Sequence, residues 1–159
     1  MINLKTLEAK GFKNLKLENM SFPEEGNILI TGRNESGKST LFEVIYFLLC
    51  GNLLVTTTSR SLRDAIAYDK NVANVSLIFQ KNTVPAKIQR TISRRGNGAT
   101  DTVKFWLHYG TDEETIFTGM DPESRDETND MIEEFLGFDG DVLTNSCFVE
   151  QKGIEGFIK

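Results

Sequence analysis

The chain has 159 residues, a formal net charge of -5 at pH 7 and 39% hydrophobic residues. This length is enough for one domain with a hydrophobic core and too short for two domains of ordinary size. The acidic balance excludes a surface that binds nucleic acid everywhere. Two cysteines, Cys50 and Cys147, lie in apolar segments without C-x-x-C or nearby histidine spacing, so they exclude a disulfide framework or a zinc site and favour a reducing compartment.

The N-terminal segments favour a hairpin. Residues 2–11 and 15–22 show apolar positions at a period of two, and Phe12-Lys13-Asn14 separates them. The chain then passes through residues 23–26 into an apolar run, 28–30, which predicts a further strand. A helix is predicted from Lys38 to Leu49, with Gly51 as its stop.

Between that strand and that helix stands the pattern G-x-x-x-x-G-K-S, residues 32–39. Gly32 and Gly37 allow backbone N–H groups to turn inward and form an anion-binding nest at the positive end of the helix. Lys38 would reach the β- and γ-phosphates, and the Ser39 hydroxyl would coordinate Mg²⁺. The alternative is a surface turn that caps a buried helix. Strand, loop and helix in this order favour nucleotide binding.

The middle and the end of the chain alternate between loops, strands and one clear helix. Residues 53–69 are expected to form a segment that runs over the surface. Strands are expected at 72–79, 86–92 and 102–107, forming an antiparallel meander. A helix is expected from Asp121-Pro122-Glu123 to Gly137. Residues 142–149 are apolar enough for another strand, which residues 150–153 would break.

Parts of a hydrolytic site are missing from the sequence. We find no apolar run followed by Asp-Glu and no L-S-G-G motif, although phosphoryl transfer needs a metal-holding carboxylate and a group that positions water. The one histidine, His108, is interpreted as a partly buried strand residue of the meander. Gln151 follows a predicted core strand, from which an amide could reach Mg²⁺ and orient water; a surface turn residue is the alternative.

Basic residues concentrate in one central stretch: Lys87, Arg90, Arg94, Arg95 and Lys104. We predict that Arg94, Arg95 and Lys104 contact DNA, with an ordinary solvated hairpin face as the alternative. The longest apolar run, 41–50, is too short to cross a bilayer, and no signal-peptide pattern precedes it. An intracellular protein of the cytoplasm, nucleoid or nucleus, with no membrane partner, is expected.

Taken together, several segments resemble the N-terminal half of an SMC-like ABC-type ATPase. They are Gly11-Phe12-Lys13-Asn14, the loop with Thr40, Phe42-Glu43-Val44-Ile45, and the stretch from Phe138 to Gln151. Within that superfamily the chain most resembles the double-strand-break repair ATPase Rad-fifty, which works with the Mre-eleven nuclease. The resemblance spans nearly the whole chain, but only the phosphate loop is strongly specific. Family members usually carry Gly at position 35 and Pro or another residue at position 33; Glu35 puts the usual local turn in doubt, and Arg33 could add a basic contact.

The resemblance implies a role for each matching residue. Lys13 would lie near the phosphates or ribose, and Lys38 and Gln151 would act in catalysis. Ser39 and Gln151 would ligate Mg²⁺. The residues that would cradle the phosphates of ATP are Asn34, Glu35, Ser36, Gly37, Lys38, Ser39 and Thr40. In the family the chain continues into a coiled coil and returns with the missing motifs, so this chain would be one half of a split head.

The expected fold is therefore α/β: a P-loop ABC-ATPase half-domain, residues 1–159, with an appended antiparallel β-sheet. The expected function is ATP binding in a repair ATPase head that gates DNA ends. Its expected partners are its C-terminal half, a second ATPase head, a Mre-eleven-type nuclease and DNA. Another SMC-like or RecF-like ATPase and a small P-loop kinase are the alternatives, and a pure binding module stays open. A regulatory GTPase is excluded because the Asn-Lys-x-Asp guanine motif is absent.

Overall fold

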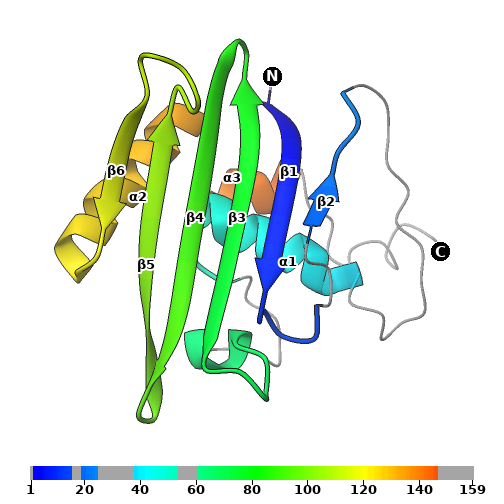
Figure 1. Cartoon of the computed structure of the whole chain (residues 1–159), viewed down its shortest axis with the longest axis vertical. Helices are drawn as coiled ribbons and strands as arrows, with labels where there is room; N and C mark the ends of the chain where they lie inside the picture. The colour runs from blue at the N-terminus through cyan, green and yellow to red at the C-terminus, as the bar shows by residue number, and fades with distance from the viewer. Residues whose placement is uncertain (1, 16–18, 25–37, 54–60, 147–159) are drawn as a thin grey trace.

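Six antiparallel strands form one sheet in the computed structural model, which describes residues 2–15, 19–24, 38–53 and 61–146. The strand order is β2-β1-β3-β4-β5-β6 (Figure 1). The strands are β1 (Ile2–Lys10), β2 (Asn19–Ser21), β3 (Val72–Lys81), β4 (Val84–Arg95), β5 (Gly98–Leu107) and β6 (Thr115–Gly119). The predicted hairpin and meander are confirmed, but they join into a single sheet because β1 pairs with β3. Strand β6 was not predicted.

Two-residue turns connect the central strands. Lys81 pairs with Val84 around Asn82, whose φ of 55° is the left-handed conformation that such turns favour. Arg95 pairs with Gly98 around Gly96, also at φ 55°. These short turns fix the register of β3, β4 and β5, and therefore fix which side chains share each face.

The helices of the described residues lie behind the sheet in Figure 1. They are α1 (Lys38–Cys50), the short 3-10 helix η1 (Leu62–Ala65), α2 (Pro122–Leu136) and α3 (Gly140–Ser146). Both predicted helices are confirmed. Asp121 caps α2 by accepting the Ser124 N–H at 2.8 Å, and Gly137 ends the helix at a φ of 84°.

The strand predicted at 142–149 is wrong for its described part, because α3 occupies residues 140–146. Asp139 Oδ1 accepts the Val142 N–H at 3.0 Å, which starts a helix where the apolar residues alone suggested a strand. Leu143 is buried, and α3 contacts α1. Gly140 permits that contact, since a Cβ there would lie 2.6 Å from the Tyr46 hydroxyl oxygen.

The surface excursion predicted at 53–69 is also only partly correct. Residues 54–60 lie outside the described part of the chain, but Ala65 and Ile66 are buried beneath the sheet. Phe12 forms an isolated β-bridge with Ile66, so η1 is tied to the turn that follows β1.

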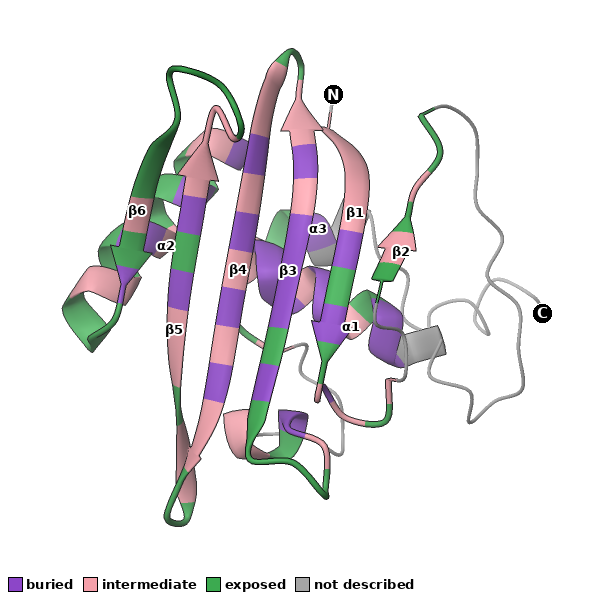
Figure 2. Ribbon diagram, viewed as in Figure 1, coloured by how far each residue is buried: buried purple, intermediate pink, exposed green. Residues whose placement is uncertain are grey.

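The core fills the space between the sheet and these helices. Every second residue of β4 from Ala86 to Ile92 is buried, and β3 follows the same alternation except that Ser76 is buried as well (Figure 2). Phe79, Ile88 and Phe105 from the sheet are buried, as are Phe47 of α1 and Ile132 of α2. This alternation is the period-two pattern of a sheet covered on one side only.

Arg90 corrects the sequence interpretation, which grouped it with a basic stretch. It shares the helix-covered side with Ile88 and Ile92 and is fully buried. Its Nε donates to the Leu48 carbonyl at 2.9 Å, and its guanidinium lies 5.7 Å from the Phe47 ring centroid. Burial lowers the pKa of Arg90 to about 10. Arg90 thus fastens the last turn of α1 to β4.

Candidate functional site

The phosphate-binding residues fall mostly outside the described part of the chain. This holds for Asn34, Glu35, Ser36, Gly37 and Gln151. Lys38 and Ser39 are described only through their backbone, as the first two residues of α1. Helix α1 therefore begins where the sequence predicts the phosphate loop to end, and a helix N-terminus is a favourable position for an anion.

A tight turn after β1 lies against this helix. Gly11 has a φ of 74°, and a Cβ on it would come within 2.4 Å of the Val72 carbonyl oxygen, so only glycine fits. Phe12 is fully buried, with its ring centroid 6.1 Å from that of Phe47. The turn is thereby packed onto the face of α1 that points into the core.

The next two residues of the turn make polar contacts with the first half of α1. Lys13 Nζ donates to Glu43 Oε2 in an ion pair whose side chains are both mostly buried. The Thr40 hydroxyl, also buried, donates to Asn14 Oδ1 at 3.3 Å. Lys13 is thus held about one helical turn from the end of the predicted phosphate loop.

Backbone hydrogen bonds fix the other side of the turn. The Lys13 N–H donates to the Ala65 carbonyl at 2.7 Å, and the Ala67 N–H donates to the Gly11 carbonyl at 2.7 Å. The turn is therefore clamped between α1 and the η1 segment, and Lys13 adopts a positive φ of 45° within it. A non-glycine residue in that conformation is uncommon and often marks a functional site.

A cleft of about 520 Å³ opens beside the turn. Its lining is rich in cations and contains Lys13, Asn14, Arg63, Asp64, Ile66, Tyr68 and Arg94. Arg63 Nε is buried and has no hydrogen-bond partner among the described residues, although a buried N–H normally has one. The cleft, with three cations in its lining, is suited to a polar, anionic ligand.

The three predicted DNA contacts do not gather in one place. The Arg94 side chain turns to the helix-covered side, where its Nε donates to the Lys70 carbonyl at 2.9 Å and its Nη2 donates to the Ala67 carbonyl at 3.1 Å. Arg94 therefore holds the segment after η1 and lines the cleft. Arg95 and Lys104 are exposed and lie in register positions of the opposite side of the sheet.

Sequence reasoning missed Glu43, Asn14 and Arg63 as candidate site residues. A signal for Glu43 was present, because an acid interrupts the otherwise apolar run of α1. His108, interpreted as a strand residue, stands one residue beyond β5 in a turn, with a φ of 56°.

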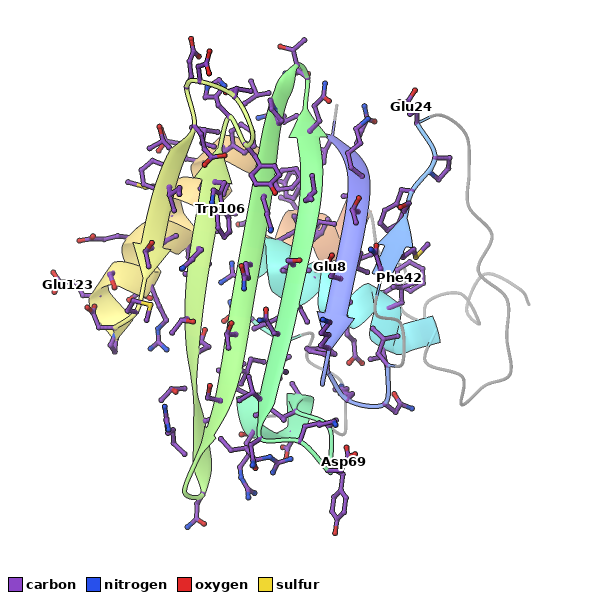
Figure 3. The ribbon with its side chains drawn as sticks, in the orientation of Figure 1. Glu8, Glu24, Phe42, Asp69, Trp106 and Glu123 are labelled. Atoms are coloured by element: carbon purple, nitrogen blue, oxygen red, sulfur yellow. The ribbon has the colours of Figure 1, made fainter. Side chains whose placement is uncertain are left out.

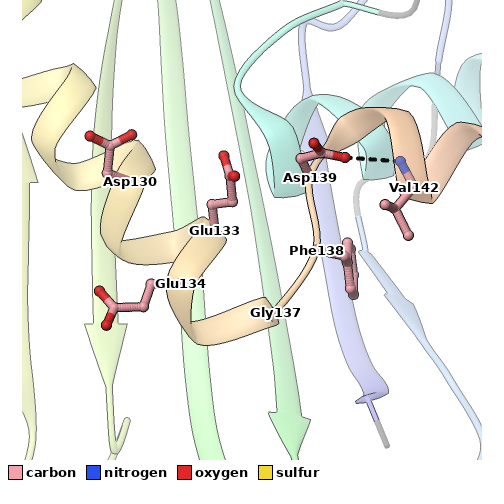
Figure 4. Close-up of a pocket in the computed structure, with 7 residues that line it drawn as sticks. All are labelled: Asp130, Glu133, Glu134, Gly137, Phe138, Asp139 and Val142. Carbon is pink, nitrogen blue, oxygen red and sulfur yellow. Dashed lines mark hydrogen bonds between the residues drawn. The ribbon is translucent and has the colours of Figure 1, made fainter.

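A second hollow, of about 550 Å³, has the opposite charge. It lies between α2 and α3, as Figure 4 shows, and is lined by Asp130, Glu133, Glu134, Gly137, Phe138, Asp139 and Val142. No group of three or more His, Cys, Asp or Glu side chains suited to a metal occurs among the described residues. The carboxylates of this hollow would repel phosphate groups.

Comparison with known proteins decides the family. The model of a family described as an AAA domain matches residues 6–157. The chain belongs to this family. Its fold, a mixed α/β arrangement around an antiparallel sheet, is that of SMC-like ABC ATPases. None of the described helices has both the length and the apolar character needed to span a bilayer.

The relatives described here are DNA-repair proteins by name. The chain is 28% identical over 155 residues to the DNA double-strand break repair Rad50 ATPase of Methanocaldococcus jannaschii, covering 98% of this chain and 14% of the relative. It is 32% identical over 102 residues to the DNA replication and repair protein RecF of Lactobacillus acidophilus, covering 64% of this chain and 24% of the relative. The chain thus spans less than a quarter of the length of either relative.

Two solved structures share the fold of this chain. One, from work on ATP-driven dimerization and DNA-stimulated activation of SMC ATPases, matches with a TM-score of 0.66 at 24% identity, over 99% of this chain and 91% of that one. Another, of the recombination mediator RecF with ATP, matches with a TM-score of 0.55 at 27% identity, over 65% of this chain and 26% of that one.

Proposed function

We propose that this chain is the ATP-binding half of a DNA double-strand-break repair ATPase head. The observation that carries the proposal is the turn of residues 11–14, which is clamped to α1 beside a cationic cleft. The helix that it contacts begins with Lys38 and Ser39, the last two residues of the phosphate-loop pattern. The AAA-domain family and the Rad50 relatives support the same conclusion.

In this proposal the triphosphate binds at the N-terminus of α1. The loop backbone from Asn34 to Gly37 donates to the phosphates, Lys38 neutralises them, and Ser39 and Gln151 ligate Mg²⁺. The ribose or base then enters the neighbouring cleft, where Lys13 and the unpartnered Arg63 Nε supply donors. A cleft of about 520 Å³ is within the range that small-molecule sites occupy.

The site is completed by other polypeptide segments. The proposed partners are the C-terminal half of the same ATPase and a second head, which together would supply the metal-holding carboxylates and the signature contacts that this sequence lacks. ATP binding would bring two heads together, and hydrolysis would separate them, so that DNA ends and a Mre-eleven-type nuclease are gated.

The first test is nucleotide binding by the chain itself. Lys38→Ala should abolish binding of a fluorescent ATP analogue, because it removes the cation that pairs with the β- and γ-phosphates. Lys70→Ala is the matched control, since the Lys70 side chain is exposed in the turn before β3 and should leave affinity unchanged. Unchanged affinity in Lys38→Ala would overturn the nucleotide assignment.

The second test concerns catalysis. The chain alone should hydrolyse ATP negligibly, and addition of the C-terminal half should restore turnover. Gln151→Ala in the reassembled head should then lower kcat far more than nucleotide affinity, because its proposed contacts are to metal and attacking water. Robust turnover by the chain alone, lost in Lys38→Ala, would show that the split-head proposal is wrong.

A RecF-like repair ATPase is the second candidate, because RecF of L. acidophilus has the higher identity, 32%, over the shorter match. Binding to a Mre-eleven-type nuclease separates the two candidates. A reassembled head that retains that nuclease on a column supports the Rad50-like role, whereas a head that fails to retain it supports the RecF-like role.

A further inference from the structure

The side of the sheet opposite α1 and α2 is an open face. We define the open face by the register positions on the side opposite the rung Leu77, Ile88, Phe105. The rung Ser76, Gln89, Lys104, Thr118 crosses it, and the next rung is Ile78, Lys87, Trp106, Ile116. In Figure 3, Glu8 and Trp106 project from this side, while the helices lie behind the sheet. No described helix covers it.

The open face is basic although the chain is acidic. Its charged side chains in paired strand positions are Lys10, Lys87, Arg95 and Lys104, opposed by Glu8. The chain as a whole has a net charge of -5, and α2 on the other side carries much of the excess acid. The strands of the open face are therefore basic while α2 on the other side is acidic, so a polyanion is attracted to the open face and repelled by α2.

An aromatic cluster stands at one end of the open face. Lys87 Nζ lies 5.1 Å from the Trp106 ring centroid and 5.4 Å from that of Tyr109, and the two rings meet edge to face at 6.3 Å. Ile116, opposite Trp106, is 51% exposed. A cation between two aromatic rings places a phosphate partner and a stacking surface side by side.

We infer that the open face binds single-stranded nucleic acid, with phosphates on Lys104 and Arg95 and an unpaired base stacked in the Trp106 and Tyr109 cluster. This inference rests on the proposed repair function and names the strand form that the face selects. A flat sheet cannot enter a duplex groove as a helix does, whereas bases are free to stack on aromatic side chains only where the strand is unpaired. Unpaired strands occur at processed DNA ends.

The test uses Trp106, which is the only tryptophan of the chain. Oligothymidylate added to the full chain should quench tryptophan emission, because a stacked base contacts the indole ring. A duplex of equal phosphate content should bind at least about tenfold more weakly and leave the emission unchanged. Equal affinity for the two with unquenched emission would overturn the inference.

Variants separate stacking from charge. Trp106→Leu should weaken oligothymidylate binding by about tenfold, and Trp106→Phe should retain most of the affinity, since a phenyl ring also stacks. Lys104→Glu should weaken single strands of every sequence and lower the salt dependence by about one phosphate contact. Full affinity in both Trp106→Leu and Lys104→Glu would place the contact elsewhere.

A matched pair tests the face itself. Glu8→Gln and Glu127→Gln remove the same charge, one from the open face and one from the exposed side of α2. Only Glu8→Gln should strengthen oligothymidylate binding; equal strengthening in both would mean that overall charge, and not the open face, governs binding.

Binding of the fluorescent ATP analogue is measured on the same samples. Wild-type chain that binds the analogue but not oligothymidylate overturns this inference alone, whereas failure to bind the analogue overturns the proposed nucleotide site.

Discussion

The two faces of the sheet are built from the same strands but have different surroundings: one packs against the helices and the other faces solvent. On β4, Ile88, Arg90 and Ile92 face the helices and are fully buried, while the residues between them, such as Gln89 and Thr91, face solvent. The covered face fixes the position of α1 and the turn beside it. The open face contributes little packing, so its side chains are free to be chosen for charge and hydrogen bonding.

The difference teaches that a sheet can keep stability and ligand binding separate at neighbouring positions. A substitution on the covered face should change the free energy of unfolding and, through α1, the affinity of the proposed nucleotide site. A substitution on the open face should change only what binds there. The predictions below test that separation, from the largest expected effect to the smallest.

Neighbouring residues of β4 give the sharpest contrast. Ile92→Ala should lower the free energy of unfolding by about 2–5 kcal/mol, because it opens a cavity in the core. Thr91→Ala, on the open face, should change it by no more than about 0.5 kcal/mol. Urea denaturation followed by circular dichroism measures both. Similar losses in the two variants would show that the open face is covered in solution.

The turn after β1 should be the next most sensitive element. Gly11→Ala should cost at least about 1–3 kcal/mol, because alanine is strained at a φ of 74° and its Cβ would clash with the Val72 carbonyl. It should also weaken binding of the ATP analogue, since Gly11 positions Lys13 and Asn14. Gly110→Ala is the control: its φ is 78°, but nothing lies within 4 Å of the added Cβ. If Gly110→Ala is equally damaging, the backbone conformation and not the close approach decides the cost.

The ionisation of Cys50 should have the smallest effect on the free energy of unfolding at neutral pH. Burial raises the pKa of Cys50 from 9.0 to about 11, so its thiolate is scarce at pH 8. In a Cys147→Ser background, alkylation by iodoacetamide should be about a hundredfold slower in the folded chain than in urea. Between pH 9 and 11 the unfolded thiol is ionised and the folded one is not, so this group lowers stability as the pH rises. Equal alkylation rates with and without urea would contradict the partly buried position of the thiol.

The sequence predicted local elements well where a physical signal marks both ends. Helix α2 was readable because Asp121 and Pro122 open it and Gly137 closes it. The phosphate-loop helix was readable from Lys38 and Gly51. Residues 140–146 were not, because a short apolar run fits strand or helix equally, and the deciding Asp139 cap is a single residue.

Side-chain roles were harder to predict than elements. Arg90 belonged by composition to a basic stretch, yet its place two residues from both Ile88 and Ile92 already put it on the apolar side. The Arg94 side chain donates hydrogen bonds to carbonyls of the segment after η1. Such a long-range contact cannot be predicted from a local sequence pattern. The contact between Lys13 and Glu43 likewise depends on how the turn meets α1.

Two cationic side chains of the sheet donate hydrogen bonds to the C-terminal ends of α1 and α2. Arg90 bonds the Leu48 carbonyl in the last turn of α1, and Lys81 Nζ bonds the Phe135 carbonyl at 2.6 Å in the last turn of α2. Since carbonyl oxygens concentrate negative charge at a helix C-terminus, these bonds resist displacement there. Helix α1 is therefore held near both ends, by Arg90 at Leu48 and by the turn after β1 at Thr40 and Glu43. A ligand that displaced its N-terminal end would have to strain the contacts of Lys13 and Asn14 as well as the bond from β4.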